Sequence, residues 1–87
     1  MTIDTEFPVH KLKALLSNKA GVLGRVMTVL TRMQVNVLSV HADVTENPDI
    51  SEIIFTFTEN NKGETELVSK QLRRQVDVLD VENLTEY

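Results

Sequence analysis

Residues 9–44 read VHKLKALLSNKAGVLGRVMTVLTRMQVNVLSVHADV, and the spacing of their apolar side chains changes twice. Apolar and polar residues alternate over 9–16, which predicts a half-buried strand. Over 21–33 the apolar residues recur three and four positions apart, as on one face of an amphipathic helix. Alternation returns over 35–44 and predicts a second strand that packs on one side. On this strand Leu38, Val40, Ala42 and Val44 share one face, and Val37, Ser39, His41 and Asp43 share the other.

The rest of the chain begins with a turn and then repeats these patterns. The run Glu-Asn-Pro-Asp at 46–49 is typical of a turn, and the alternation over 51–58 predicts a third strand. The helical spacing of Leu67, Val68 and Leu72 predicts a helix over 64–74. Acidic side chains in its first turn and basic ones in its last complement the helix dipole. Residues 76–84 predict a fourth strand. The face of the third strand that is expected to enter the core carries Ile53, Phe55 and Phe57.

The predicted order β-α-β-β-α-β is that of an α+β, ferredoxin-like fold. We expect a four-stranded antiparallel sheet with two helices on one face. The first residues, 1–8, are interpreted as a polar lead-in, and 9–87 as a single domain. The uncovered sheet face is expected to be partly polar and to carry Lys11, Lys13, Ser39, His41, Asp43, Thr56 and Thr58.

Composition narrows the classes of function. The chain has 87 residues, of which 41% are apolar and 25% charged, as in ordinary globular domains. A domain of this size buries only about 60–65% of its unfolded surface, so we expect self-association. It contains no cysteine, which excludes disulfides, a thiolate nucleophile and zinc–thiolate sites.

The charge is uneven along the chain. The net charge of −4 divides into +3 over residues 1–40 and −7 over residues 41–87. Neither half carries a dense basic stripe, so neither nucleic acid nor a membrane surface is an expected partner. Since the apolar runs are too short for a signal peptide or a membrane span, we expect a cytoplasmic protein.

Candidate catalytic residues are few. His10 and His41 are the side chains that titrate near neutral pH, and neither has a nucleophile at motif spacing. We interpret both as surface or edge histidines. The acidic pairs within 64–66 and 80–82 are interpreted as solvated faces. The sequence therefore predicts no catalytic residues and no metal site.

The loop from Ser17 to Val22 is more informative, because it joins a strand to a helix and leaves backbone amides without intrahelical partners. Gly21 permits close approach to the main chain, and Asn18 supplies a donor and an acceptor. Together they could hold a carboxylate at the helix start. In the alternative, Asn18 caps the helix and Gly21 only relieves crowding. The residues alone leave both interpretations open.

Asn36 is a polar amide at the point where the first helix passes into the second strand. By itself it is typical of a turn. The strand that follows is a plausible sheet edge, however, and an edge in a small domain is a natural site for pairing with a second copy. Asn36 of one copy could then face the Asn18 loop of the other.

Four segments resemble the ACT domains, and among them the small regulatory subunits of acetohydroxyacid synthase (AHAS, or acetolactate synthase). Residues 16–26 are similar to the family's Asn-x-x-Gly-Val-Leu-x-Arg loop and helix start, and residues 35–40 to its aromatic-Asn-Ile-Glu-Ser-Leu strand. Residues 45–51 resemble its Thr-Glu-Asp-Pro-x-x-Ser hairpin. Residues 70–81 resemble Lys-Gln-Leu-x-Lys-Leu-x-Asp-Val-Leu-x-Val, the segment that most separates this subfamily from other ACT domains. The likeness covers about residues 9–86.

The resemblance implies a regulatory subunit rather than an enzyme. Such domains form homodimers by joining two sheets side by side, and they bind a branched-chain amino acid, usually valine, at the dimer interface. They modulate a separate catalytic large subunit, which carries thiamine diphosphate, so no cofactor is implied for this chain. The implied effector-binding residues are Asn18, Ala20, Gly21 and Val22 of one chain and Asn36 and Val37 of its partner.

The chain departs from the family pattern at several positions. Many members have Pro or Ser at Ala20, Gly and an aromatic residue at Gln34 and Val35, Glu at Leu38 and Arg at Glu52, and many continue into a second domain. The changes at Leu38 and Glu52 could alter the choice of effector or the surface offered to the catalytic subunit.

Two questions stay open at the level of sequence. Arg73 and Arg74 are candidates for the surface that meets the catalytic subunit, although a solvated helix end is the simpler interpretation. The alternative function is a stand-alone ACT dimer that senses another amino acid, or a ligand-free scaffold, and that serves a different enzyme or transporter.

Overall fold

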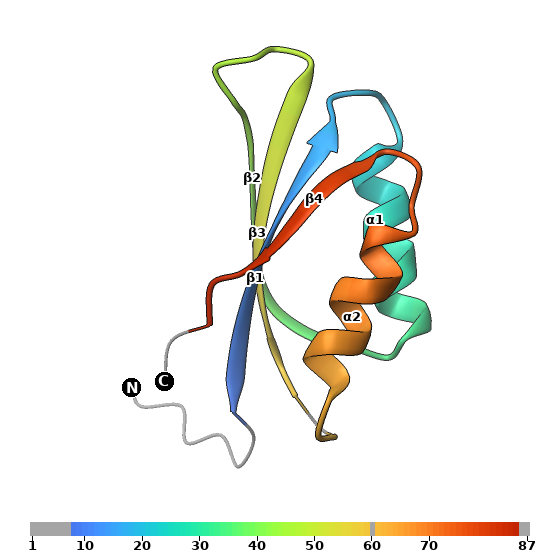
Figure 1. Ribbon diagram of the computed structural model, residues 1–87, viewed down its shortest axis with the longest axis vertical. Coiled ribbons are helices and arrows are strands. Elements are labelled where there is room, and N and C mark those ends of the chain that lie inside the picture. Colours follow the sequence, from blue (N-terminus) through green and yellow to red (C-terminus); the bar gives the residue numbers. More distant parts are fainter. Residues whose placement is uncertain (1–7, 60, 86–87) are drawn as a thin grey trace.

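The computed structural model describes residues 8–59 and 61–85, and it contains the six predicted elements in the predicted order. The strands form one antiparallel sheet in the order β2-β3-β1-β4, and both helices cover the same face (Figure 1). The ferredoxin-like arrangement is therefore confirmed. Most of the predicted lead-in, residues 1–7, lies outside the described part of the chain. The elements are β1 (Val9–Ser17), α1 (Val22–Arg32), β2 (Asn36–Val44), β3 (Ile50–Thr58), α2 (Glu64–Arg73) and β4 (Val78–Asn83).

The core lies between the helices and the two central strands. Alternate residues of β1 and β3 point into it, and α1 and α2 contribute residues at helical spacing, as the apolar patterns predict. The predicted inward face of the third strand is confirmed, because its three members are at most 1% exposed. The largest fully buried side chains are Phe55, Phe57, Leu12, Leu16, Leu30, Ile53, Leu72, Val26 and Val68.

Helix α1 ends in a Schellman motif. The amide of Val35 donates to the carbonyl of Leu30 at 3.1 Å, and the amide of Gln34 donates to the carbonyl of Thr31 at 3.0 Å. Val35 and Leu30 are both buried, which supplies the apolar contact that accompanies this motif. Gln34 has a φ of 58°, a left-handed conformation that glycine usually occupies. The chain therefore carries a strained residue where it turns from α1 into β2.

The second strand differs from its prediction. It lies at the sheet edge as expected, but its register shifts between Val37 and Ser39, so that Leu38 is an extra residue. Val37 pairs with Phe57 and packs against the core, whereas simple alternation placed it on the polar face with Ser39. The prediction for Val37 is wrong because a one-residue bulge exchanges the two faces.

Three further placements correct the sequence-based interpretation. His10 is not a surface histidine, since it is 6% exposed and stacks on Phe57 with ring centroids 5.9 Å apart. Thr58 is in phase with Thr56 on the uncovered face, as expected, but it is buried there at 5% exposure, and its hydroxyl accepts a hydrogen bond from Asn36 Nδ2 at 3.4 Å. Val76 lies in the turn before β4 rather than in the strand, because the amide of Val78 closes a turn onto the carbonyl of Gln75.

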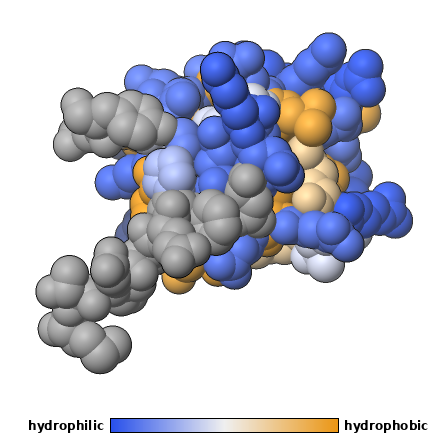
Figure 2. Space-filling view, turned by 90° about the horizontal axis from the view of Figure 1, so that it is seen from below, coloured by the Kyte–Doolittle hydropathy of each residue, from blue (hydrophilic) through white to orange (hydrophobic). Residues whose placement is uncertain are grey.

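Three connections meet at one end of the sheet. The β1–α1 loop, the β2–β3 hairpin and the α2–β4 turn all lie at the upper end in Figure 1. The opposite end, seen in Figure 2, is mostly hydrophilic, with hydrophobic residues exposed on the helix side. Neither α1 nor α2 has the length and apolar character needed to cross a membrane.

Candidate functional site

The β1–α1 loop is held by both of the other connections at its end of the sheet. The amide of Ser17 donates to the carbonyl of Asp77 at 2.9 Å, in the α2–β4 turn. The amide of Asn18 donates to the carbonyl of Asp49 at 2.8 Å, in the β2–β3 hairpin. Lys19 and Arg25 both pair with the Asp77 carboxylate, at 3.8 and 3.2 Å. The loop is therefore fixed on two sides before any ligand binds.

Asn18 does not cap the helix. Its Nδ2 donates to the carbonyl of Pro48 at 2.8 Å, and the N-cap residue of α1 is Gly21, with no side-chain capping hydrogen bond. The capping alternative is therefore wrong for Asn18. The amide group ties the loop to the hairpin and lies at the surface, beside the start of α1.

The start of α1 offers uncompensated backbone donors. Gly21 has a φ of 85°, and a side chain added there would meet no atom within 4 Å, so the main chain is open to a ligand. Among the described residues, the amides of Ala20 and Gly21 have no hydrogen-bond acceptor. The first turn of α1 contains no acidic residue, in contrast to α2, which has Glu64 and Glu66 there. This end of α1 therefore favours an anion such as a carboxylate.

A hollow of about 190 Å³ lies between this loop and the edge of the sheet. Its floor is apolar, and polar groups border it: Asn18 and Lys19 from the loop and Asp43 from β2. Pockets that bury a ligand fully are usually larger, about 300–1,000 Å³. A ligand in this hollow would therefore be only partly enclosed by one chain. The apolar lining residues are Val22, Leu23, Ala42, Val44 and Ile53.

The structure brings only some of the predicted site residues together. Asn18 and Val22 line the hollow, and Ala20 and Gly21 form the turn that leads into Val22. Asn36 and Val37 begin β2, whose other end borders the hollow. Since β2 rises about 3.3 Å per residue, roughly 25 Å separate its two ends. Within one chain, Asn36 and Val37 therefore cannot reach a ligand bound at Gly21.

Sequence reasoning missed the residues that β2 contributes to the hollow. Ala42 and Val44 lie on the same face of the sheet as Ile53, because Ala42 pairs with Ile53 across the hairpin. Val44 is 58% exposed although it faces the helix side. The sequence did contain a signal for these residues, because apolar side chains recur at every second position of the strand as far as Val44. The loop that lies opposite could not be identified from this local pattern.

A partly buried polar cluster lies elsewhere, at the start of α2. Glu59 Oε2 accepts hydrogen bonds from the Thr65 hydroxyl at 2.6 Å and the Thr65 amide at 3.2 Å, and it lies 3.5 Å from His10 Nε2. The Thr65 hydroxyl is the main reason that the pKa of Glu59 lies below its usual value, and the Thr65 amide and His10 add to this effect. Glu59 thus supplies the capping acceptor that Gly63 cannot.

The second histidine is exposed. His41 Nε2 lies 2.8 Å from Asp43 Oδ2 on the outer strand β2, and both side chains are more than 60% exposed. Within residues 8–59 and 61–85, no three metal-ligating side chains are grouped to hold an ion. The interpretation of His41 as an edge histidine is confirmed.

Comparison with known proteins identifies relatives of this arrangement. A family model described as the AHAS small subunit-like ACT domain matches residues 12–80. The acetolactate synthase small subunit of Bacillus subtilis (strain 168) is 34% identical over 68 residues, which are 78% of this chain and 40% of that protein. The chain thus spans less than half the length of this curated relative.

Solved structures agree with this match. The acetolactate synthase small subunit from Thermotoga maritima superposes with a TM-score of 0.79 at 25% identity, over 87% of this chain and 47% of that one. The ACT domain from the GTP pyrophosphokinase of Chlorobium tepidum superposes with a TM-score of 0.76 at 18% identity, over 92% of this chain and 100% of that one. The latter likeness concerns the fold alone.

Proposed function

Because the chain belongs to the AHAS small subunit-like ACT domain family, we propose that it is the amino-acid-sensing part of an acetolactate synthase small subunit. It acts as a non-catalytic regulator of the catalytic large subunit, which carries the thiamine diphosphate, in the cytoplasm. The small-subunit names of its relatives support the partner. The regulator works because the effector binds one arrangement of the assembly better than another.

The functional unit is a homodimer in which two β2 strands pair along their exposed edges. Support comes from β2 itself, an edge strand that pairs with β3 on one side only and is exposed almost throughout. Leu38, Val40 and Val44 are 42–58% exposed, which is unusual for three aliphatic residues on one short strand. Pairing with a second copy would bury them and satisfy the free edge.

The effector is a branched-chain amino acid, valine first, and it binds between the two copies. Its carboxylate lies at the start of α1, near the free amides of Ala20 and Gly21, and Asn18 borders it. Its aliphatic side chain packs on the apolar floor of the hollow. The absence of acidic residues from the first turn of α1 and the apolar lining support this orientation.

Asn36 and Val37 of the partner subunit complete the site. If two β2 strands pair antiparallel about a two-fold axis near Val40, each strand's first residues lie beside the last residues of the other. Asn36 of the partner subunit is then opposite Val44, which lines the hollow. This geometry reconciles the 25 Å separation within one chain, estimated from the strand rise, with a single effector site.

The observation that carries the proposal is the half-open hollow between the β1–α1 loop and an exposed edge strand. Isothermal titration of the chain with valine, leucine and isoleucine, together with its mass by light scattering, tests it. A dimer that binds valine at one or two sites supports the proposal. A folded dimer that binds none of the three favours the scaffold alternative, and a monomer contradicts the shared site.

A further inference from the structure

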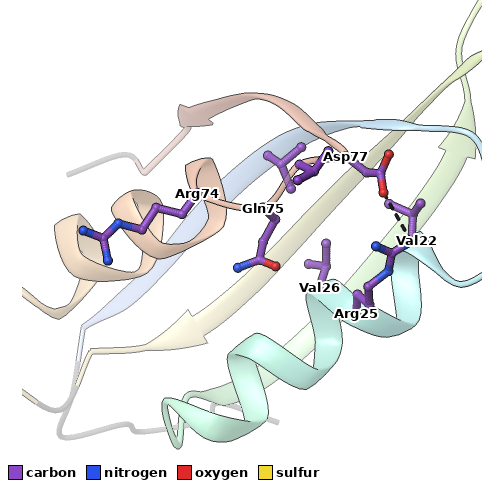
Figure 3. Close-up of a pocket in the computed structure, with 8 residues that line it drawn as sticks. Val22, Arg25, Val26, Arg74, Gln75 and Asp77 are labelled. Carbon is purple, nitrogen blue, oxygen red and sulfur yellow. Dashed lines mark ion pairs between the residues drawn. The ribbon is translucent and has the colours of Figure 1, made fainter.

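A second cavity lies on the other side of the effector loop. It has a volume of about 130 Å³ and separates the first half of α1 from the α2–β4 turn (Figure 3). Val22 and Val26 form its wall on α1, and Gln75 reaches toward it from the end of α2 (Figure 3). Since the hollow at the sheet edge involves neither Val26 nor Gln75, the two cavities are distinct.

The mouth of this cavity exposes an aliphatic residue. Val76 is 93% exposed, the largest exposure among the large hydrophobic side chains of the described residues. It lies in the turn between Gln75 and Asp77, where the described part of the chain buries almost none of its surface. An exposed aliphatic residue beside an apolar hollow is typical of a protein–protein contact.

The rim is basic, although the chain is acidic overall. Arg25, Arg74 and the Asp77 carboxylate line the cavity, and Lys19 lies nearby because it also pairs with Asp77. These three basic groups and one acidic group leave a net charge of +2 at the rim, whereas the whole chain has a net charge of −4. Figure 3 shows the Arg74 side chain extending back along α2, away from Val26 and Asp77, and no described acidic residue pairs with it. Such a rim attracts an acidic partner.

The two neighbouring arginines behave differently. Arg73 pairs with Asp80 at 3.5 Å and donates to the carbonyl of Val81, so it holds α2 against β4. Arg74 makes no ion pair with any described residue. A solvated helix end explains an exposed arginine, but it does not explain why Val76 is exposed beside it.

The second cavity is joined to the effector loop by direct contacts. Val22 lines both cavities. Asp77 lines the second cavity, holds Lys19 and Arg25 through its side chain, and accepts the hydrogen bond of Ser17 through its carbonyl. A change in the position of the loop therefore changes the shape of the cavity.

We propose that this cavity, with Val76 and Arg74 at its mouth, is the docking point for an acidic segment of the catalytic subunit that inserts an aliphatic side chain. The proposal rests on the proposed regulatory function and adds the surface through which it acts. The basic rim and the exposed valine specify the chemistry of the partner. The shared wall at Val22 explains how an effector at the sheet edge alters the contact.

The test measures association of the chain with the purified AHAS large subunit from the same organism, by titration calorimetry and by the rate of acetolactate formation. Val76→Ser and Arg74→Glu should each weaken association about tenfold or more, because they remove the exposed apolar contact and reverse a rim charge. Their valine affinity and circular dichroism should match the wild type, since both side chains lie outside the core and the hollow.

Two matched control variants show whether the loss of any exposed aliphatic residue, or the reversal of any basic charge, weakens the association. Leu67→Ser removes another half-exposed aliphatic residue from α2, and Arg32→Glu reverses the charge of an arginine in the last turn of α1. Both should associate like the wild type. Wild-type association of Val76→Ser and Arg74→Glu would overturn the docking proposal alone. A wild-type chain that does not associate with the large subunit would overturn the proposed function as well.

Discussion

Asn18 Nδ2 donates a hydrogen bond to the carbonyl of Pro48 at 2.8 Å, which joins the β1–α1 loop to the β2–β3 hairpin across 30 positions of the sequence. The same asparagine borders the hollow in which we place the effector. Asn18 therefore has a structural role that exists without a ligand, and the effector site is built on a loop that is already positioned. Pre-positioned groups lower the cost of ordering on binding.

Replacement of Asn18 should consequently affect stability as well as binding. Asn18→Ala removes one exposed hydrogen bond and should lower the free energy of unfolding by about 1 kcal/mol. Asn18→Asp keeps the size but places a carboxylate oxygen toward the Pro48 carbonyl, and it should be the less stable of the two. Urea denaturation followed by circular dichroism measures both. An unchanged stability in Asn18→Ala would mean that the contact with Pro48 contributes nothing.

Gly21 allows the charge at the start of α1 to be tested by itself. Asn and Asp tolerate positive φ better than other residues, and a side chain at Gly21 meets open space. Gly21→Asn and Gly21→Asp should therefore have similar stabilities, about 1 kcal/mol below the wild type. Only Gly21→Asp should abolish valine binding, because it places a negative charge where the carboxylate must lie. Equal valine affinities in the two variants would exclude this end of α1 as the carboxylate site.

Gln34 occupies the left-handed position of the Schellman motif at a φ of 58°. Glycine at this position removes a strain of roughly 1–2 kcal/mol from the folded chain. Its greater freedom in the unfolded chain lowers the stability by about 0.5–1 kcal/mol. Gln34→Gly should therefore raise the free energy of unfolding by about 0.5–1 kcal/mol. Met33→Gly, one residue earlier where φ is −79°, should lower it. Thermal melts of the two variants decide whether the strain at Gln34 is real.

Glu59 should make stability depend on acidity. The pKa of Glu59 is below its usual value of 4.5 in the folded chain, chiefly because of the Thr65 hydroxyl. The unfolded chain takes up the proton first as the pH falls, so the stabilisation is complete above pH 4.5 and is lost as the pH falls through the folded pKa. Glu59→Gln should be less stable at pH 7, and its deficit should shrink below pH 4.5. A deficit that is the same at pH 7 and pH 3 would show that the charge of Glu59 has no role.

Much of the fold was predictable because its apolar residues follow the helical spacing and the strand spacing clearly. The helices carry buried valines and leucines at helical spacing, and the central strands alternate strictly through Leu12 and Phe55. The bulge at Leu38 was not predictable, because apolar residues occupy both phases of β2 around it. His10 lies in phase with Leu12, so a signal for its burial existed. It was misinterpreted because β1 was not recognised as a central strand.

The candidate site was predictable only in part. The strand-to-helix change marks the loop around Gly21, since free amides at a helix start depend on local sequence. The opposite wall depends on the pairing of β2 with β3, which places Ala42 and Val44 beside the loop. The hairpin itself sets that register, but the placement of the β1–α1 loop beside the hairpin depends on a contact between Asn18 and Pro48, 30 positions apart in the sequence. The position of Val76 in a turn was not predictable either, because the alternation of apolar residues continues through Val76 into β4.

The central claim is that one effector site contains residues of two chains, and mixing two inactive variants tests it most directly. Gly21→Asp blocks the loop, and Asn36→Ala removes the amide that the partner contributes; each alone should bind valine poorly. After subunit exchange, half of the dimers should be mixed, and each mixed dimer holds one intact site. Titration calorimetry should then recover about a quarter of the wild-type sites. No recovery, in a mixture shown to exchange subunits, would contradict a site shared between two chains.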